Sequence, residues 1–488
     1  MLQTDSDRSR QCLTATLGAL FLYCPLLIAA DGERASTLAD QTEIALTIYN
    51  DDLALVRDQR QIVLEKGFNV LAFREISAKI RPETALLRSI SHSDGMVLIE
   101  QNFDYDLLTP QKLLEKFVGS SVGIVRSHPT TGAETTETAR VLSVNEGVVL
   151  QFPDRIEMQT PGRVVFNEVP PNLRDKPTLV VQLNSATAAK QTLELSYLTG
   201  GLHWKADYVA ALSKEDDHID VTGWVTLSNQ SGATYNNAKL QLIAGSVNRI
   251  ADEVQHVYDT LSKQREMALA AAPEMREESL FEYHLYTLSR PTAIADNQTK
   301  QVSLLSATAV PVVKEYRLQG QDYYYQSQYG DLGEKMKVAV YVEFKNDEAS
   351  RLGMPLPKGI VRVYKKDAAG NVQFVGEDRM DHTPKNEHVR LRLGDAFDVT
   401  ANKKQTDFKK QGAVGKFSFV ADQAFAVKLK NAKPSSVLVH VVEPIPGDWE
   451  MLKESHAHEK ASSNTARWKI EVPAEGEATL EYRVRVRF

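Results

Sequence analysis

Apolar and polar residues alternate with a period of two along most of the chain. Ile44, Leu46 and Ile48 form the first apolar face, and the turn residues Asn50-Asp51-Asp52 end that run. Similar short runs, separated by turn clusters, continue to the C-terminus. This spacing is typical of strands with one buried face, and many short strands with few helices favour sandwiches over a parallel sheet. The sequence therefore predicts an all-β protein of tandem β-sandwiches.

A short helix interrupts these strands. Thr109 is a good N-cap, Gly119 suits a helix end, and five short strand patterns follow. One helix before five short strands is the order of a small Sm-like barrel, which we expect as an insertion at 108–171. The preceding strands predict an N-terminal β-sandwich at 41–107, which residues 172–194 could complete.

The strand pattern breaks inside the C-terminal β-sandwich region that we expect at 195–488. Residues 251–280 are polar, rich in Glu, Gln, Ala and Met, and only weakly helical in their period. We therefore expect a flexible or helical excursion near 251–297.

The N-terminus carries an apolar run, Leu13–Ile28, which follows Arg8 and Arg10 and closes on Ala29-Ala30. A basic start, an apolar centre and small residues at the end are the parts of an export signal. We expect a signal peptide at 1–30 that is removed by cleavage, with an uncleaved membrane anchor as the alternative.

Both cysteines, Cys12 and Cys24, lie in this segment. A mature chain without thiols has no disulfide, no thiolate metal site and no cysteine nucleophile. The net charge of -7 disfavours nucleic acid as a partner, and no later run reaches the roughly 18 apolar residues of a transmembrane helix. We expect export to the periplasm or the outer surface of a Gram-negative-type bacterium, with an envelope protein or a glycan as the partner.

The densest ionisable cluster contains Glu377, Asp378, Asp381 and His382, which follow the strand pattern Val372–Val375. The cluster could hold a divalent metal, or Asp381 and His382 could serve as a catalytic acid and base. Polar residues of a turn that leaves the strand explain the same composition.

His456 and His458 form a second candidate metal site. Residues two apart share one face of a strand, and Glu450 and Glu454 could complete the set of ligands. The stretch Lys453–Ser463 is so polar, however, that a loop with an incidental histidine pair is the favoured interpretation.

Two further clusters have ordinary interpretations. Tyr323–Tyr325 with Tyr329 could stack on a sugar, but a surface aromatic cluster is favoured. Lys403-Lys404 and Lys409-Lys410 could face an anionic glycan or lipid, but neighbouring aspartates favour a solvated loop of mixed charge.

Six separated phrases of the chain occur in the order seen in a known family. They resemble an uncharacterised family of bacterial exported proteins, whose shared domain of unknown function has a relative at the C-terminus of mucoidy inhibitor A-like proteins. The resemblance covers roughly residues 190–488 and implies β-sandwich architecture without an established activity, so it assigns no catalytic residues. The chain lacks the long coiled coil of the mucoidy-inhibitor-like members. The phrases are Leu195–Tyr208, Gly223–Asn229, Leu242–Arg249, Glu282–Tyr286, Gly376–Lys385 and Val442–Trp449.

The leading functional hypothesis is a non-enzymatic scaffold or binding module of the cell envelope, without a cofactor. One alternative is a metal-dependent hydrolase of an envelope substrate, built from the 377–382 cluster with His284 or His456. The other is an outer-membrane β-barrel component, because apolar residues alternate with charged ones from Leu480 to Phe488. The predicted helix and the long polar loops favour a sandwich strand at that position.

Overall fold

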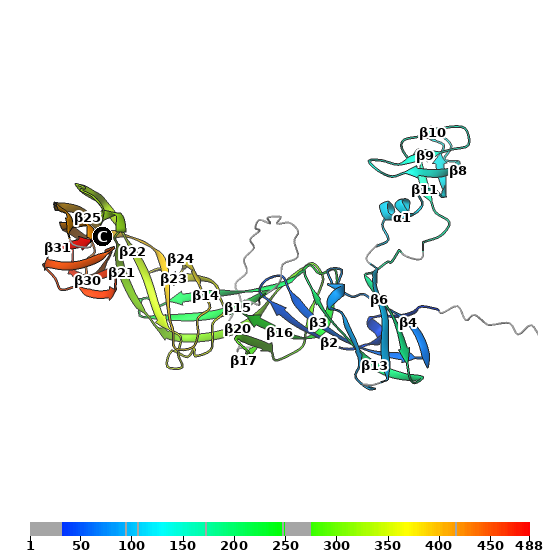
Figure 1. Ribbon diagram of the computed structural model, residues 1–488, viewed down its shortest axis with the longest axis horizontal. Coiled ribbons are helices and arrows are strands. Elements are labelled where there is room, and N and C mark those ends of the chain that lie inside the picture. The colour runs from blue at the N-terminus through cyan, green and yellow to red at the C-terminus, as the bar shows by residue number, and fades with distance from the viewer. Residues whose placement is uncertain are drawn as a thin grey trace, which may run out of the picture.

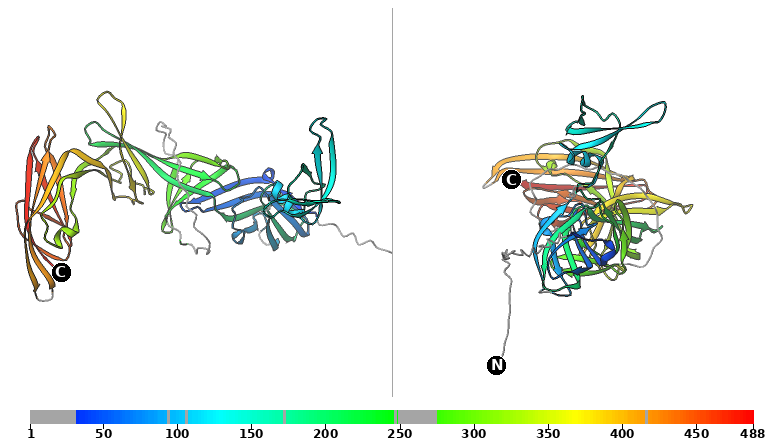
Figure 2. Two further views of the ribbon diagram at one scale, coloured as in Figure 1. Left: turned by 90° about the horizontal axis from the view of Figure 1, so that it is seen from above. Right: turned by 90° about the vertical axis from the view of Figure 1, so that its right-hand side faces the viewer.

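The sheets of the protein follow one another in a row, from the N-terminal sheets at one end to the C-terminal sheet at the other (Figure 1, Figure 2). The described residues form a nearly all-β structure with 65% strand and one α-helix, which confirms the all-β prediction. The predicted signal peptide with Cys12 and Cys24 lies outside the described residues, as does 251–274 of the predicted excursion. In the part that is described, no helix has the length and apolarity that a membrane span needs. The computed structural model describes residues 32–92, 95–104, 107–170, 173–245, 248, 275–414 and 417–488.

Two sheets form the N-terminal end. The four-stranded sheet has the order β1 (Arg34–Ser36), β4 (Gly67–Arg74), β12 (Thr178–Ser185) and β6 (Met96–Asp104). The eight-stranded sheet has the order β17 (Met275–Leu280), β18 (Tyr283–Leu288), β16 (Tyr235–Ala244), β2 (Gln41–Tyr49), β3 (Ala54–Leu64), β13 (Ala189–Thr199) and β5 (Leu86–Ser89), and β19 (Thr292–Ile294) also pairs with β16. Short 3-10 turns, η1 (Leu38–Asp40) and η2 (Pro82–Thr84), lie among these strands. Because β12 lies between β4 and β6, and β13 between β3 and β5, late strands complete both early sheets.

The segment between β6 and β12 forms a separate small unit, beginning with α1 (Pro110–Lys116) (Figure 1). The Thr109 hydroxyl caps α1 by accepting the N–H of Lys112 at 3.1 Å. A five-stranded sheet follows, in the order β10 (Ile156–Glu157), β9 (Val149–Gln151), β8 (Glu134–Ser143), β7 (Ser121–Ser127) and β11 (Arg163–Val165). No pairing joins the short edge strands β10 and β11 in the part of the chain described, so the expected Sm-like barrel is an open sheet there.

The two ends of this small unit lie side by side. Leu107 forms an isolated parallel bridge with Arg174, and the N–H of Leu108 donates to the Arg174 carbonyl at 2.8 Å. The chain thus leaves the four-stranded sheet and returns to it at one place.

A five-stranded sheet forms the centre of the molecule, in the order β20 (Gln298–Pro311), β15 (His218–Asn229), β14 (Leu202–Leu212), β23 (Gly359–Lys366) and β24 (Val372–Met380). β14 and β23 run parallel, and the Ala206 carbonyl lies so close to Gly359 that a side chain there would overlap it. One hydrophobic core joins this sheet to the eight-stranded sheet, since Trp204 of β14 and Ile48 of β2 both belong to it. We call it the first core.

The C-terminal sheet has nine strands, in the order β28 (Asp448–Glu454), β31 (Glu477–Arg487), β26 (Phe417–Asn431), β25 (His388–Val414), β22 (Asp331–Lys345), β21 (Val313–Gln319), β27 (Val437–Pro444), β30 (Thr465–Val472) and β29 (Glu459–Ser462). It folds around a second core, so that its first and last strands approach each other at Trp449 of β28. The Trp449 indole N–H donates to the Ser463 carbonyl at 2.9 Å, and Lys460 Nζ of β29 lies 4.7 Å from the indole ring.

Two long strands, β22 and β25, contribute to both cores. On β22, Val342 is buried in the first core and Val338 in the second. On β25, Leu391 belongs to the first core and Val399 to the second. These strands pair with each other from Lys345 opposite His388 to Asp331 opposite Lys404. The central and C-terminal sheets are therefore joined by the ladder of β22 and β25.

The predicted excursion near 251–297 is wrong from residue 275 onward, where the chain forms β17, β18 and β19. β17 is the outermost strand of its sheet, and most of its side chains are exposed. The polar composition that suggested irregular structure is that of an edge strand facing solvent.

Candidate functional site

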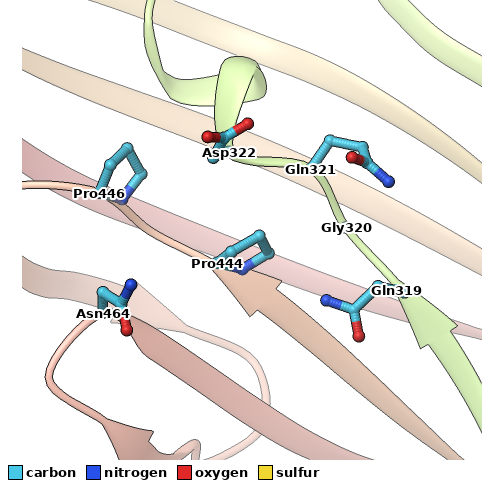
Figure 3. A pocket seen from close by; sticks show the side chains of 7 residues that line it. All are labelled: Gln319, Gly320, Gln321, Asp322, Pro444, Pro446 and Asn464. Atoms are coloured by element: carbon cyan, nitrogen blue, oxygen red, sulfur yellow. The ribbon is translucent and has the colours of Figure 1, made fainter. Parts of the chain in front are cut away.

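A cavity of about 340 Å³ opens on the C-terminal sheet where β21 and β27 end (Figure 3). These neighbouring strands are parallel, so their carboxyl ends meet at the same edge. The N–H of Gly320 donates to the Val442 carbonyl at 2.8 Å, and the N–H of Ile445 donates to the Asn464 carbonyl at 2.7 Å, which ties the walls together. The lining residues are Gln319, Gly320, Gln321, Asp322, Pro444, Pro446 and Asn464.

The wall of the cavity combines side-chain amides, one carboxylate and two proline rings. Figure 3 shows Gln319 and Asn464 on either side of Pro444, with Asp322 at the start of η3 (Asp322–Tyr325). Amides both donate and accept hydrogen bonds, whereas a carboxylate accepts them. The wall of the cavity therefore offers both donors and acceptors of hydrogen bonds.

Directly behind the wall lies a buried carboxylate, that of Glu443. A Cβ atom on Gly320 would overlap Glu443 Oε2, so only a glycine fits between the cavity and this carboxylate. Glu443 is fully buried, and its Oε1 atom has no hydrogen-bond partner within the described residues.

Glu443 pairs with Lys403 in the interior of the sheet. Lys403 Nζ lies 2.6 Å from Glu443 Oε2, and neither side chain is exposed. The Tyr325 hydroxyl donates to Glu443 Oε2 at 3.0 Å, Lys403 Nζ donates to the Tyr482 hydroxyl at 3.2 Å, and the two hydroxyls lie 2.9 Å apart. Four side chains thus form one buried polar network.

Aromatic rings enclose this network. Lys403 Nζ lies 4.5 Å from the ring centre of Tyr324 and 5.1 Å from that of Phe425, and the ring of Tyr482 stacks on Trp468 at 4.8 Å. Burial lowers the pKa of Lys403, and the neighbouring Glu443 carboxylate opposes this effect. Burial also raises the pKa values of the tyrosines in the network, Tyr325 and Tyr482.

Sequence reasoning missed the centre of this network. Lys403 was expected in a solvated loop, but it lies inside β25, and Tyr324 and Tyr325 are core residues, not a surface cluster. A usable signal was present: Lys403 continues the period of two that the apolar residues Val399 and Ala401 begin, and all three are buried.

The predicted pair His456 and His458 does not converge. His456 Nδ1 lies 2.9 Å from the Ser455 hydroxyl, whereas His458 Nδ1 lies 2.9 Å from Glu454 Oε2. The imidazole of His458 sits between the rings of Trp449 at 5.5 Å and Trp468 at 5.9 Å. Glu450, the other proposed ligand, pairs with Arg487 on the neighbouring strand β31.

The carboxylates of Glu377 and Asp378 point to separate partners. Glu377 Oε2 lies 3.2 Å from Arg362 Nε on the neighbouring strand, and Asp378 Oδ2 accepts the N–H of Arg392 at 2.7 Å. The Asp381 carbonyl accepts the Thr383 hydroxyl at 2.9 Å. These contacts fix the end of β24 in place.

His382 and His284, which the hydrolase hypothesis could combine, each contact a different group. Burial, the Lys358 ammonium and His284 lower the pKa of His382, and Asp381 opposes them. His382 Nδ1 accepts the N–H of Lys358 at 3.2 Å, and His284 Nδ1 lies 2.8 Å from Glu277 Oε1. Across the described ranges, no three His, Cys, Asp or Glu residues are placed to hold one metal ion.

The protein is thus a nearly all-β protein whose sheets follow one another, and its cavity lies on the C-terminal sheet. The chain belongs to the family described as Domain of unknown function (DUF4139), whose model matches residues 193–488. Comparison with curated proteins gives no match. The matched region begins within β13 and contains the ladder of β22 and β25 as well as the cavity.

Proposed function

We propose that this protein is a non-enzymatic scaffold or binding module of the cell envelope, exported to the periplasm or the outer surface. The observation that carries the proposal is the ladder of β22 and β25, whose side chains lie in both cores. Strands whose side chains are buried in two cores cannot act as a flexible linker, because swinging one sheet against the other would expose apolar side chains. The protein therefore keeps molecules that bind to its two ends at a fixed distance from each other.

The ladder is bent as well as continuous. Its register shifts between Lys337 and Ala339, and again between Val340 and Tyr341, near the place where one core gives way to the other. β-Bulges of this kind bend and twist a strand pair without ending it. The bend sets the angle between the central and C-terminal sheets.

The cavity of Figure 3 supports the binding part of the proposal. Its amides and carboxylate suit an envelope protein segment or a glycan, and its volume of about 340 Å³ is within the range of small-ligand sites. The apolar run at 13–28 behind two arginines supports export.

A distance measurement tests the fixed geometry. Spin labels on Ala369→Cys in the central sheet's β23–β24 turn and Ser436→Cys before β27 report the separation of the two sheets. We expect a distance distribution as narrow as that of a reference pair within the C-terminal sheet, Ser436→Cys with Lys453→Cys. A distribution several times broader than the reference contradicts a rigid scaffold.

An activity assay tests the non-enzymatic part. Purified protein is incubated with glycan, peptide and ester substrates, with and without added divalent metal. Turnover that disappears in both Asp381→Asn and His382→Ala overturns the proposal in favour of the hydrolase.

A further inference from the structure

We propose that the tip of the β17–β18 hairpin, residues 280–282, docks into an apolar pocket with a basic rim on a partner protein. The inference deepens the proposed scaffold role and rests on it. Three features of the hairpin carry it: a strained aromatic residue at the tip, a rigid base, and acidic residues around the tip.

The strain is at Phe281. β17 and β18 are joined by the two-residue turn Phe281-Glu282, with Leu280 paired to Tyr283, and Phe281 has a φ of 56°. Such tight turns favour Gly, Asn or Asp, because a bulky side chain at positive φ meets its own backbone. The chain therefore places phenylalanine where phenylalanine is locally unfavourable.

The phenylalanine gains little inside the molecule in return. Its side chain is 84% exposed and Leu280 is 45% exposed. Its nearest aromatic contact is a tilted one with Tyr283, at 6.3 Å between ring centres. Strain that internal packing does not offset points to a role outside the molecule, and an exposed aromatic tip is the form of an interface anchor.

The base of the hairpin holds this tip still. Tyr286 of β18 is fully buried, its hydroxyl donates to the Pro355 carbonyl at 3.0 Å, and its ring lies 6.3 Å from that of Trp204. Leu285 and Leu288 are buried beside it. A tip presented on a rigid base loses little entropy on binding.

The negative charge around the tip indicates what kind of partner it binds. Glu278 and Glu282 are exposed next to the apolar tip, and Glu277 lies on the same strand, 2.8 Å from His284. These carboxylates repel the phosphates of a membrane surface and attract lysine and arginine. A protein pocket with a basic rim fits this tip better than a lipid surface does.

Site-specific crosslinking tests the proposal. A photoreactive benzoylphenylalanine replaces Phe281 in the full chain, produced in its native cells, and Phe397 serves as the matched control because it is 95% exposed on β25. We expect one protein adduct from position 281 that is absent from position 397. The double variant Glu278→Lys/Glu282→Lys should reduce this adduct by at least about tenfold. A lipid adduct, an adduct with a second copy of this chain, equal adducts from both positions, or no adduct overturns the proposal.

A second variant separates strain from binding. In this variant the photoreactive group is moved to Ser279, and Phe281 is replaced by glycine. Phe281→Gly should raise the melting temperature, because glycine accepts the positive φ. The same substitution should abolish the adduct. A lower melting temperature, or an unchanged adduct, contradicts the inference. Failure here leaves the distance test of the scaffold unaffected, since neither spin-labelled site touches the hairpin.

Discussion

Lys403 and Glu443 form an ion pair of 2.6 Å in which neither side chain reaches solvent. Removing one partner leaves the other charged and alone inside an aromatic core. We expect Glu443→Ala to destabilise the folded protein by about 3 to 5 kcal/mol, as measured by denaturant unfolding. The double variant Lys403→Met/Glu443→Met is the control and should recover most of that loss. A single variant within about 1 kcal/mol of the wild type contradicts a buried charged pair.

Gly320 should tolerate no side chain, because a Cβ there overlaps Glu443 Oε2. We expect Gly320→Ala to cost about 1 to 3 kcal/mol of unfolding free energy through overpacking. Gly330→Ala, in the bend just before β22, is the matched control, since nothing lies within 4 Å of a Cβ at that position. Equal losses in the two variants would argue against the close approach at Gly320.

Alkaline unfolding should depend on Tyr235, which burial holds at a pKa of about 12 against its ordinary 10.0. Between these values the unfolded chain loses the tyrosine proton and the folded chain keeps it. Stability that is complete below pH 10 is therefore lost as the pH rises toward 12, by about 2 to 3 kcal/mol for this residue. Tyr235→Phe should flatten the decline in a pH series of chemical denaturation. The exposed Tyr323→Phe should leave it as steep as in the wild type.

The two cores should unfold together. Because β22 and β25 belong to both, Leu391→Ala in the first core and Leu480→Ala in the second should shift the same calorimetric transition, each costing about 2 to 5 kcal/mol. Leu150→Ala, in the core of the small unit between β6 and β12, should leave that transition in place. If Leu391→Ala and Leu480→Ala each shift a different calorimetric transition, the ladder does not couple the sheets.

Local patterns predicted much of this fold. Alternation from Ile44 onward predicted strands such as β2 correctly, and the N-cap at Thr109 located the one α-helix in the described residues. The partners of the strands could not be predicted in the same way. The polar face of β17 depends on its being the edge of a sheet whose neighbouring strands lie far away in sequence.

The cavity was beyond the reach of the sequence for a similar reason. Gly320, Pro444 and Asn464 come together only when β21 and β27 pair in parallel and β30 folds beside them. Lys403 was misplaced because a lysine normally marks an exposed position, and only its distant partner Glu443 makes burial possible. The prediction for the histidines failed for the opposite reason. His456 and His458 are close in sequence, but their side chains contact different partners.

The small unit of α1 and β7 to β11 leaves and rejoins the four-stranded sheet at one point, where Leu107 meets Arg174. A unit attached in this way behaves as an exchangeable cassette. It can be deleted, lengthened or replaced by another folded unit with closely spaced ends, while β6 and β12 remain paired. Insertions and substitutions in this unit can therefore accumulate without disturbing the sheets to which it is attached.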